Sequence, residues 1–337
     1  MPFESTTHRI AWYKTPLRRE ILAALNERSD WRGLAQTLGH LGLVAASGAA
    51  AWYAAGRLPL PVFVVLLLVH GTFYSFLAAA FHELTHQTVF KTKPLNTVFL
   101  YLVSWLTWAN PFWYWASHQE HHKFTLHPPE DLEVVLPFEL TLTSFLRSAL
   151  VNPWDFYYRL KMNLRLSLGR TEGAWEASLF PPEAVALRWR VFNWARLILL
   201  SHLLLTVVAL YFGLWQVPVL VTLAPFYGGC LLYLCANPQH AGLQDNVPDF
   251  RLCTRTYITN PFVQFLYWDM NYHIDHHMYA AVPCYNLGKL HAAIAHDLPA
   301  SPVGLLATWK EILAIVQRQR RDPSYQYAAK LPTPSAR

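Results

Sequence analysis

The stretch FHELTHQTVF, residues 81–90, places His82 and His86 one helical turn apart with Glu83 between them. This H-E-x-x-H spacing is typical of zinc proteases, in which the two histidines bind the metal and the glutamate acts as a base. The same spacing suits any metal centre that takes imidazoles from one face of a helix. The surrounding sequence has to distinguish between these uses.

The residues before this stretch are strongly apolar, and so is much of the chain. Apolar residues make up 53% of the 337 and charged residues only 14%, against roughly 25% charged in ordinary soluble domains. Four apolar segments are close to the ~20 residues that a bilayer requires: residues 38–55, 61–81, 191–211 and 217–235. The short connections GRLPLP and FGLWQVP join them in pairs. We therefore predict an all-α integral membrane protein with four transmembrane helices in two hairpins.

Positive charge sets the expected orientation. Lysines and arginines crowd residues 1–35, residues 91–190 and the C-terminal region, whereas the two hairpin turns hold only Arg57. By the positive-inside rule, both termini and the long middle region are cytoplasmic. The net charge of +6 then fits contact with anionic membrane lipid, and we expect no nucleic-acid partner. We divide the chain into a cytoplasmic segment 1–37, a membrane domain 38–291 and a cytoplasmic tail 292–337.

Nine of the 16 histidines fall into four tight groups, spaced so that each group can share one helix face. They are His82 and His86; His118, His121 and His122; His240; and His273, His276 and His277. Residues 61–82 would rise roughly 32 Å as a helix, about one bilayer core, and residues 217–237 roughly 30 Å. We therefore expect the four groups to meet in a helical cap on the cytoplasmic side.

Nine imidazoles exceed the needs of one ion, because a catalytic zinc takes three protein ligands. The pattern predicts a site for two metal ions, and imidazole suits Zn, Cu, Fe and Ni alike. His70 and His202 lie too deep in their segments to join this site. We expect them to contact each other or nearby hydroxyl groups.

The three boxes HELTH (82–86), HQEHH (118–122) and HIDHH (273–277), with the tail of NYHIDHHMYAAVPCYNLGKLH (271–291), resemble the membrane fatty acid desaturase/hydroxylase superfamily over residues 38–291. The resemblance implies a non-haem diiron centre that uses O2 and two external electrons. It implies that the eight box histidines are metal ligands, that His240 is a further ligand and that Asn237 lies near the metals. It also implies a separate electron donor, ferredoxin-like or cytochrome b5-like with its reductase, and a bacterial inner-membrane location.

Three carboxylates lie inside the boxes. We expect Glu83, Glu120 and Asp275 to accept the outer N–H groups of the histidines and so to fix their orientation. The loop HPPEDLEVVLP, residues 127–137, is expected to be solvated or else to dock a basic redox partner. No sequence pattern identifies substrate-binding residues.

The leading hypothesis is an O2-dependent fatty acyl desaturase that forms a C=C bond in a lipid or acyl substrate. A hydroxylase or decarboxylase on the same centre is the close alternative. A zinc intramembrane metallohydrolase would use HELTH and would not need the two HxxHH groups. A metal carrier would require ligands at mid-membrane depth, whereas these groups are expected at one face.

Overall fold

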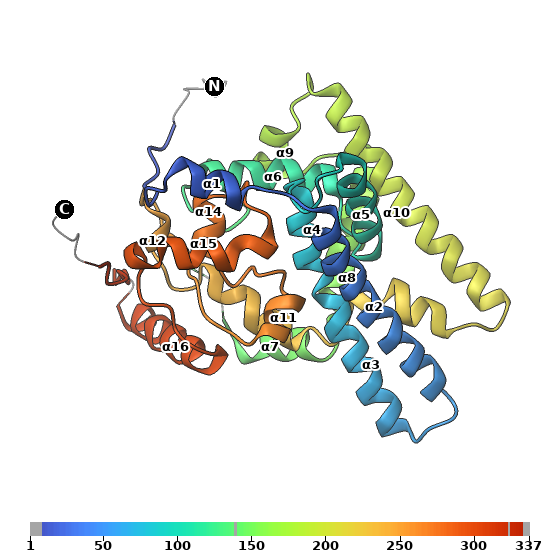
Figure 1. Ribbon diagram of the computed structural model, residues 1–337. Coiled ribbons are helices and arrows are strands. Elements are labelled where there is room, and N and C mark those ends of the chain that lie inside the picture. Colours follow the sequence, from blue (N-terminus) through green and yellow to red (C-terminus); the bar gives the residue numbers. More distant parts are fainter. Residues whose placement is uncertain (1–8, 138–139, 323, 333–337) are drawn as a thin grey trace.

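The computed structural model describes residues 9–137, 140–322 and 324–332, which fold into helices and loops (Figure 1). In this part of the chain only isolated β-bridges occur and no strand forms, so the all-helical class is confirmed. The helices are α1 (Arg19–Leu25), α2 (Asp30–Ala54), α3 (Leu60–Ser75), α4 (Leu77–Thr85), α5 (Lys93–Leu106), α6 (Pro111–Phe124), α7 (Leu142–Ala149), α8 (Pro153–Ser167), α9 (Gly173–Leu179), α10 (Val185–Tyr211), α11 (Cys230–Ala236), α12 (Phe250–Cys253), α13 (Pro261–Leu266), α14 (His273–Met278), α15 (Leu287–Ile294) and α16 (Leu305–Arg321).

The first hairpin consists of α2 and α3, which pack along each other and project from the body of the molecule (Figure 1). Ser29 caps α2 by accepting the backbone N–H of Arg32 (3.3 Å), and Pro61 lies in the first turn of α3, where it interrupts no helical hydrogen bond. After a break at Phe76 the apolar run continues as α4, so Leu60–Thr85 is a 26-residue stretch that contains an 18-residue window of mean hydropathy 2.1. His82 lies near the end of this stretch, inside the body of the molecule.

Two stretches of the described chain are long and apolar enough to cross a membrane, Leu60–Thr85 and the 27-residue α10. Exposed leucines cover the outer face of α10, including Leu200, Leu203 and Leu204. The predicted segment 38–55 falls in α2 up to Ala54, and α2 does not meet the same criterion of length and hydropathy. The four-span arrangement is therefore not found.

The predicted span at residues 217–235 is wrong as a continuous helix. The segment is divided into a π-helical turn at Pro218–Thr222, a 3-10 turn at Ala224–Phe226 and α11. Pro225 lacks a backbone N–H and therefore cannot donate the hydrogen bond that a continuous α-helix requires at this position. Gly228 has a φ of +70°, and a Cβ there would lie 2.5 Å from the carbonyl oxygen of Leu68. Since the backbone must turn sharply against α3 at this glycine, a straight helix cannot form.

The two deep histidines behave as expected, because each finds a hydroxyl group. In His70, Nδ1 lies 3.1 Å from Oγ of Ser47. In His202, Nδ1 lies 3.2 Å from Oγ1 of Thr222. Both rings therefore stabilise helix packing away from the other histidines.

Helices α12, α14, α15 and α16 lie together on the side of the molecule away from the projecting hairpin (Figure 1). The N-terminal segment crosses this side: the backbone N–H of Tyr13 donates to the carbonyl of Pro248 (3.0 Å), and the hydroxyl of Thr15 donates to Asp297 (2.7 Å). Helix α16 is anchored where the indole N–H of Trp309 donates to the carbonyl of Leu234 (2.9 Å). These contacts enclose the segments that carry the histidine boxes.

Candidate metal centre

Four separate segments bring their histidines to one place. The end of α4 carries the first box, the last two turns of α6 carry the second, α14 is the third, and His240 follows a short 3-10 turn at Asn237–Gln239. All nine predicted ligands meet: His82, His86, His118, His121, His122, His240, His273, His276 and His277.

Five of these histidines form the first group, and one nitrogen of each lies within 4.8 Å of the others. They come from three different boxes, so the group depends on tertiary packing and not on one helix. Their Nε2 separations are 3.0 Å for His82–His276, 3.3 Å for His82–His86, 3.2 Å for His86–His118 and 3.0 Å for His118–His122.

The second group joins His121, His240 and His277 within the same distance limit. His273 extends it, because its Nε2 lies 3.0 Å from that of His240 and 3.1 Å from that of His277. The two groups adjoin each other, with the rings of His122 and His277 stacked at 4.4 Å. The arrangement therefore provides two neighbouring nitrogen cages of five and four imidazoles.

The tautomers show that these nitrogens suit metal ions. In His240, Nδ1 lies 3.0 Å from the carbonyl oxygen of Cys253, which can only accept, so Nδ1 carries the proton and Nε2 is a bare lone pair. In His118, Nδ1 faces the carboxylate of Glu133 in the same way. Bare lone pairs 3.0–3.2 Å apart repel unless a cation lies between them. Metal–nitrogen bonds of about 2.1 Å at right angles would place ligand nitrogens about 3.0 Å apart, so the donor sets fit.

A buried carboxylate supports the same conclusion. Glu83 is 1% exposed, and within the described residues neither of its oxygens has a hydrogen-bond partner. Its Oε1 lies 3.5 Å from Nδ1 of His276 and 3.8 Å from Nε2 of His82. An unpaired buried anion is costly, and positive ions in the adjoining cage would balance its charge. Of the three predicted orienting carboxylates, Glu83 is the one beside the first group.

Two carboxylates that hold the histidines come from the loop that we expected to be solvated. Asp131 is 0% exposed and its Oδ2 accepts Nδ1–H of His121 (2.8 Å). Glu133 accepts Nδ1–H of His118 (2.7 Å) and the hydroxyl proton of Ser117 (2.6 Å). The solvated-loop expectation is wrong for these two residues, because the loop folds back on α6 and turns both carboxylates inward.

Two hydroxyl groups were also missed from sequence. The hydroxyl of Tyr114 lies 3.0 Å from Nδ1 of His82. Thr125 donates to the carbonyl of His121 (2.6 Å), and its oxygen lies 3.2 Å from Nδ1 of His277. Tyr114 lies four residues before His118, so helical spacing could have placed it on the same face.

Glu120 and Asp275 do not take the places expected of them. Glu120 pairs with Lys123 at the surface (2.6 Å), because position 120 lies on the outer side of α6. Asp275 is fully buried but faces away from the cages, where it accepts from Thr256 (3.0 Å) and lies 3.2 Å from Nδ1 of His291. It therefore orients a histidine outside both groups.

Burial favours the neutral form of most rings in the cages. Together with the neighbouring His121, it lowers the pKa of His86 to about 4 and that of His240 to about 3. Burial also opposes protonation of His121, but the hydrogen bond and charge of Asp131 outweigh it and the pKa of His121 is raised. Neutral imidazole is the form that binds metal.

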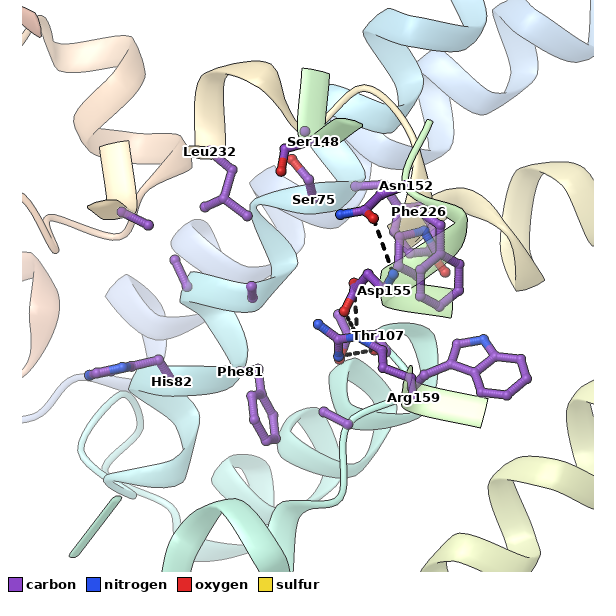
Figure 2. Close-up of a pocket in the computed structure, with 18 of the residues that line it drawn as sticks. Ser75, Phe81, His82, Thr107, Ser148, Asn152, Asp155, Arg159, Phe226 and Leu232 are labelled. Atoms are coloured by element: carbon purple, nitrogen blue, oxygen red, sulfur yellow. Dashed lines mark hydrogen bonds and ion pairs between the residues drawn. The ribbon is translucent and has the colours of Figure 1, made fainter. Parts of the chain in front are cut away.

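A cavity of about 590 Å³ reaches the first group, and His82 forms part of its wall. Figure 2 shows Phe81 and Leu232 on the side of His82 and a polar cluster on the other. In that cluster Arg159 donates to Asp155 (3.0 Å) and to the carbonyl of Thr107 (3.0 Å). The cavity size falls in the range of small-molecule sites.

Asn237 also lines this cavity, and its amide donates to the carbonyl of Tyr233 (2.9 Å). It therefore shares the wall of this cavity with His82; its place near the metals stays a prediction.

The comparisons with known proteins agree with this geometry. The family model described as fatty acid desaturase matches residues 57–309, about three quarters of the chain. The matched region contains all nine clustered histidines. No curated protein matches the chain.

Proposed function

This chain belongs to the fatty acid desaturase family, whose members are oxidoreductases, and from that premise we propose that it introduces a C=C double bond into a fatty acyl chain with O2 as oxidant. One observation carries the proposal. His82 belongs both to the five-histidine cage and to the wall of the 590 Å³ cavity. A substrate in that cavity would therefore lie against a metal ligand.

We propose two iron ions as the cofactor. The division of the histidines into five and four supports two ions, and imidazole is a good ligand for iron. Bound there with O2 and two external electrons, the irons would supply the oxidising power to remove hydrogen from an unactivated methylene group, which no side chain can do.

The residues of the chain hold and shield this centre. Asp131 and Glu133 fix the tautomer of one histidine in each cage, so that both Nε2 atoms point inward. On the substrate side, Ala79 and Phe81 provide apolar wall close to His82. These side chains exclude water and position the methylene to be oxidised, which decides between desaturation and hydroxylation.

We propose that the hairpin of α2 and α3, and α10 together with the bent segment that follows it, each enter the membrane and return to the side from which they came. The basic residues 1–35, 91–190 and the C-terminal region, and with them the metal centre, would then lie on the cytoplasmic side. The substrate would be the acyl chain of a lipid or acyl carrier at the membrane. A separate protein would donate the electrons.

The zinc hydrolase hypothesis accounts for less of the structure. It uses His82, Glu83 and His86 and leaves the whole four-histidine cage without a role. A metal carrier is disfavoured because the cages lie together at one end of Leu60–Thr85 and are not spaced along it.

Metal analysis and lipid profiling test the proposal together. Purified protein should contain about two irons per chain. The zinc hydrolase hypothesis instead predicts a single zinc ion. Expression in a host should produce a new unsaturated acyl chain that disappears in His121→Ala. The exposed His296 lies outside both cages, so His296→Ala is the matched control and should keep the product.

A hydroxylated or shortened product that depends on His121 would assign the alternative reaction on the same centre. A single zinc with no iron would overturn the proposal.

A further inference from the structure

Three aromatic rings in contact connect the surface to the four-histidine cage. The indole of Trp12 stacks on Phe250 with ring centroids 4.1 Å apart and planes 10° from parallel. The ring of Phe250 lies 5.4 Å from that of His277. Phe250 is 1% exposed, whereas Trp12 is partly exposed. The rings therefore form a continuous path from solvent to a proposed metal ligand.

Trp12 is fixed in this position by several contacts. Its indole N–H donates to the carbonyl of Lys123 (2.8 Å), and His127 packs edge-on against its ring at 5.3 Å. The next residue is pinned as well, through the hydrogen bond from Tyr13 to Pro248. The stack is thus a defined part of the fold and not a loose terminal contact.

The surface around Trp12 is basic. Residues 9–19 contain Arg9, Lys14, Arg18 and Arg19, all exposed, and no aspartate or glutamate. Such a surface attracts an acidic protein and speeds its association.

The acidic side chains that pack against this segment are already paired, since Arg251 binds Asp249 (2.8 Å) and Asp297 (2.7 Å). Glu20, which follows Arg19, is the one acidic residue between residues 9 and 20, against four basic residues. The surface therefore keeps an excess of positive charge that is available to a partner.

We propose that an acidic one-electron carrier protein docks on residues 9–19 and reduces the metal centre through Trp12, Phe250 and His277. This deepens the proposed function and rests on it. Electron tunnelling weakens steeply with distance, and ring-to-ring contact shortens each step. In each transfer one carrier molecule is oxidised by one electron. Two transfers reduce the dimetal centre by two electrons, and no covalent bond forms or breaks.

Anaerobic stopped-flow mixing tests the path without requiring substrate turnover. Iron-loaded full-length protein is mixed with a reduced, acidic [2Fe–2S] ferredoxin or with dithionite, and reduction of the iron chromophore is followed. Trp12→Leu and Phe250→Leu should slow reduction by ferredoxin about tenfold, which equals ~1.4 kcal/mol in barrier. Trp12→Phe retains an aromatic ring and should stay close to wild type. Dithionite, which is small enough to reach the centre directly, should reduce every variant at the wild-type rate.

Two further variants separate docking from electron transfer. Arg18→Glu with Arg19→Glu should raise the half-saturating ferredoxin concentration and leave the dithionite rate unchanged; glutamates at the start of α1 are compatible with that helix. Trp31→Leu is the matched control, because Trp31 is 81% exposed on α2 and should not alter either rate.

If ferredoxin reduced both Trp12→Leu and Phe250→Leu at the wild-type rate, the proposed electron path would be refuted. If dithionite but not ferredoxin reduced the wild-type protein, the proposal of an acidic carrier protein as electron donor would be refuted. The failure of the proposed function is distinct, because a wild-type protein that contains no iron would refute it whatever these variants do.

Discussion

Replacing Asp131 by asparagine tests how the cage is held. The carboxylate accepts three N–H groups: Oδ2 accepts from His121 (2.8 Å) and from the backbone of Leu126 (2.9 Å), and Oδ1 accepts from the backbone of Glu133 (2.9 Å). Asparagine has one acceptor oxygen and an NH2 group. In either orientation its NH2 must therefore face a donor.

The expected size of the effect follows from these contacts. A hydrogen bond to a charged group contributes about 1.5–3 kcal/mol. Loss of the partner that orients a metal-binding histidine typically weakens metal binding about 10–100-fold, which is ~1.4–2.8 kcal/mol. The two ranges agree, so we expect Asp131→Asn to raise the Kd for Fe2+ about 10–100-fold.

Glu133→Gln is the matched comparison. Glu133 accepts from His118 and from the hydroxyl of Ser117. The serine hydroxyl can rotate and accept an N–H from glutamine, while the glutamine oxygen keeps the bond to His118. We expect a loss of affinity below about tenfold, the lower end for such partners.

Anaerobic titration of metal-free protein with Fe2+ against a chelator of known affinity measures both constants. Thermal melting of the metal-free variants shows separately whether the fold is weakened. Wild-type affinity in Asp131→Asn, or a larger loss in Glu133→Gln than in Asp131→Asn, would refute the reasoning.

Three other results are expected. Ala79 lies one turn before His82 in the cavity wall, so Ala79→Leu should lower kcat/KM for long acyl chains about tenfold or more with iron content unchanged; products from substrates of graded length show this, and an equal loss at every length would count against it. Tyr114→Phe removes the hydroxyl partner of His82, at a cost of about 0.5–1.5 kcal/mol, and should raise the Kd for Fe2+ in the same titration, whereas an unchanged Kd would exclude this role. Burial holds the pKa of His86 at about 4 and that of His240 at about 3, below the ~6.5 of an unfolded chain, so the unfolded state binds more protons between these values. The melting midpoint of metal-free protein should therefore fall as pH drops from about 6.5 to 4, and a flat midpoint would contradict it.

The sequence predicted the cages because their determinants are periodic. Spacings of three and four residues place His118, His121 and His122 on adjoining faces of one helix. The 1.5 Å rise per residue placed His82 at the end of its long helical stretch, whereas the same estimate for His240 assumed a continuous helix at 217–235 that does not form. Glu120 was mispredicted within the same helix because box membership does not tell which face a residue occupies.

The orienting carboxylates could not be predicted, because they lie in a loop without periodicity. Their position depends on how the chain leaves α6, where Leu126 adopts a φ of +56° and is 1% exposed. Tertiary packing fixes that turn. The broken segment at 217–235 was different, since Pro218, Pro225 and Gly228 were visible warnings against a continuous helix. Apolar composition alone does not distinguish a spanning helix from a buried, bent segment.

The hydrogen bond from the backbone of Glu133 to Asp131 joins supports of both cages, since each carboxylate holds a histidine of a different group. An ion bound in either cage would stiffen the shared loop and so prepare the other cage for its own ion. We therefore expect the second ion to bind more tightly than the first and half-loaded chains to be scarce. Metal occupancy in this protein should accordingly behave as all or none.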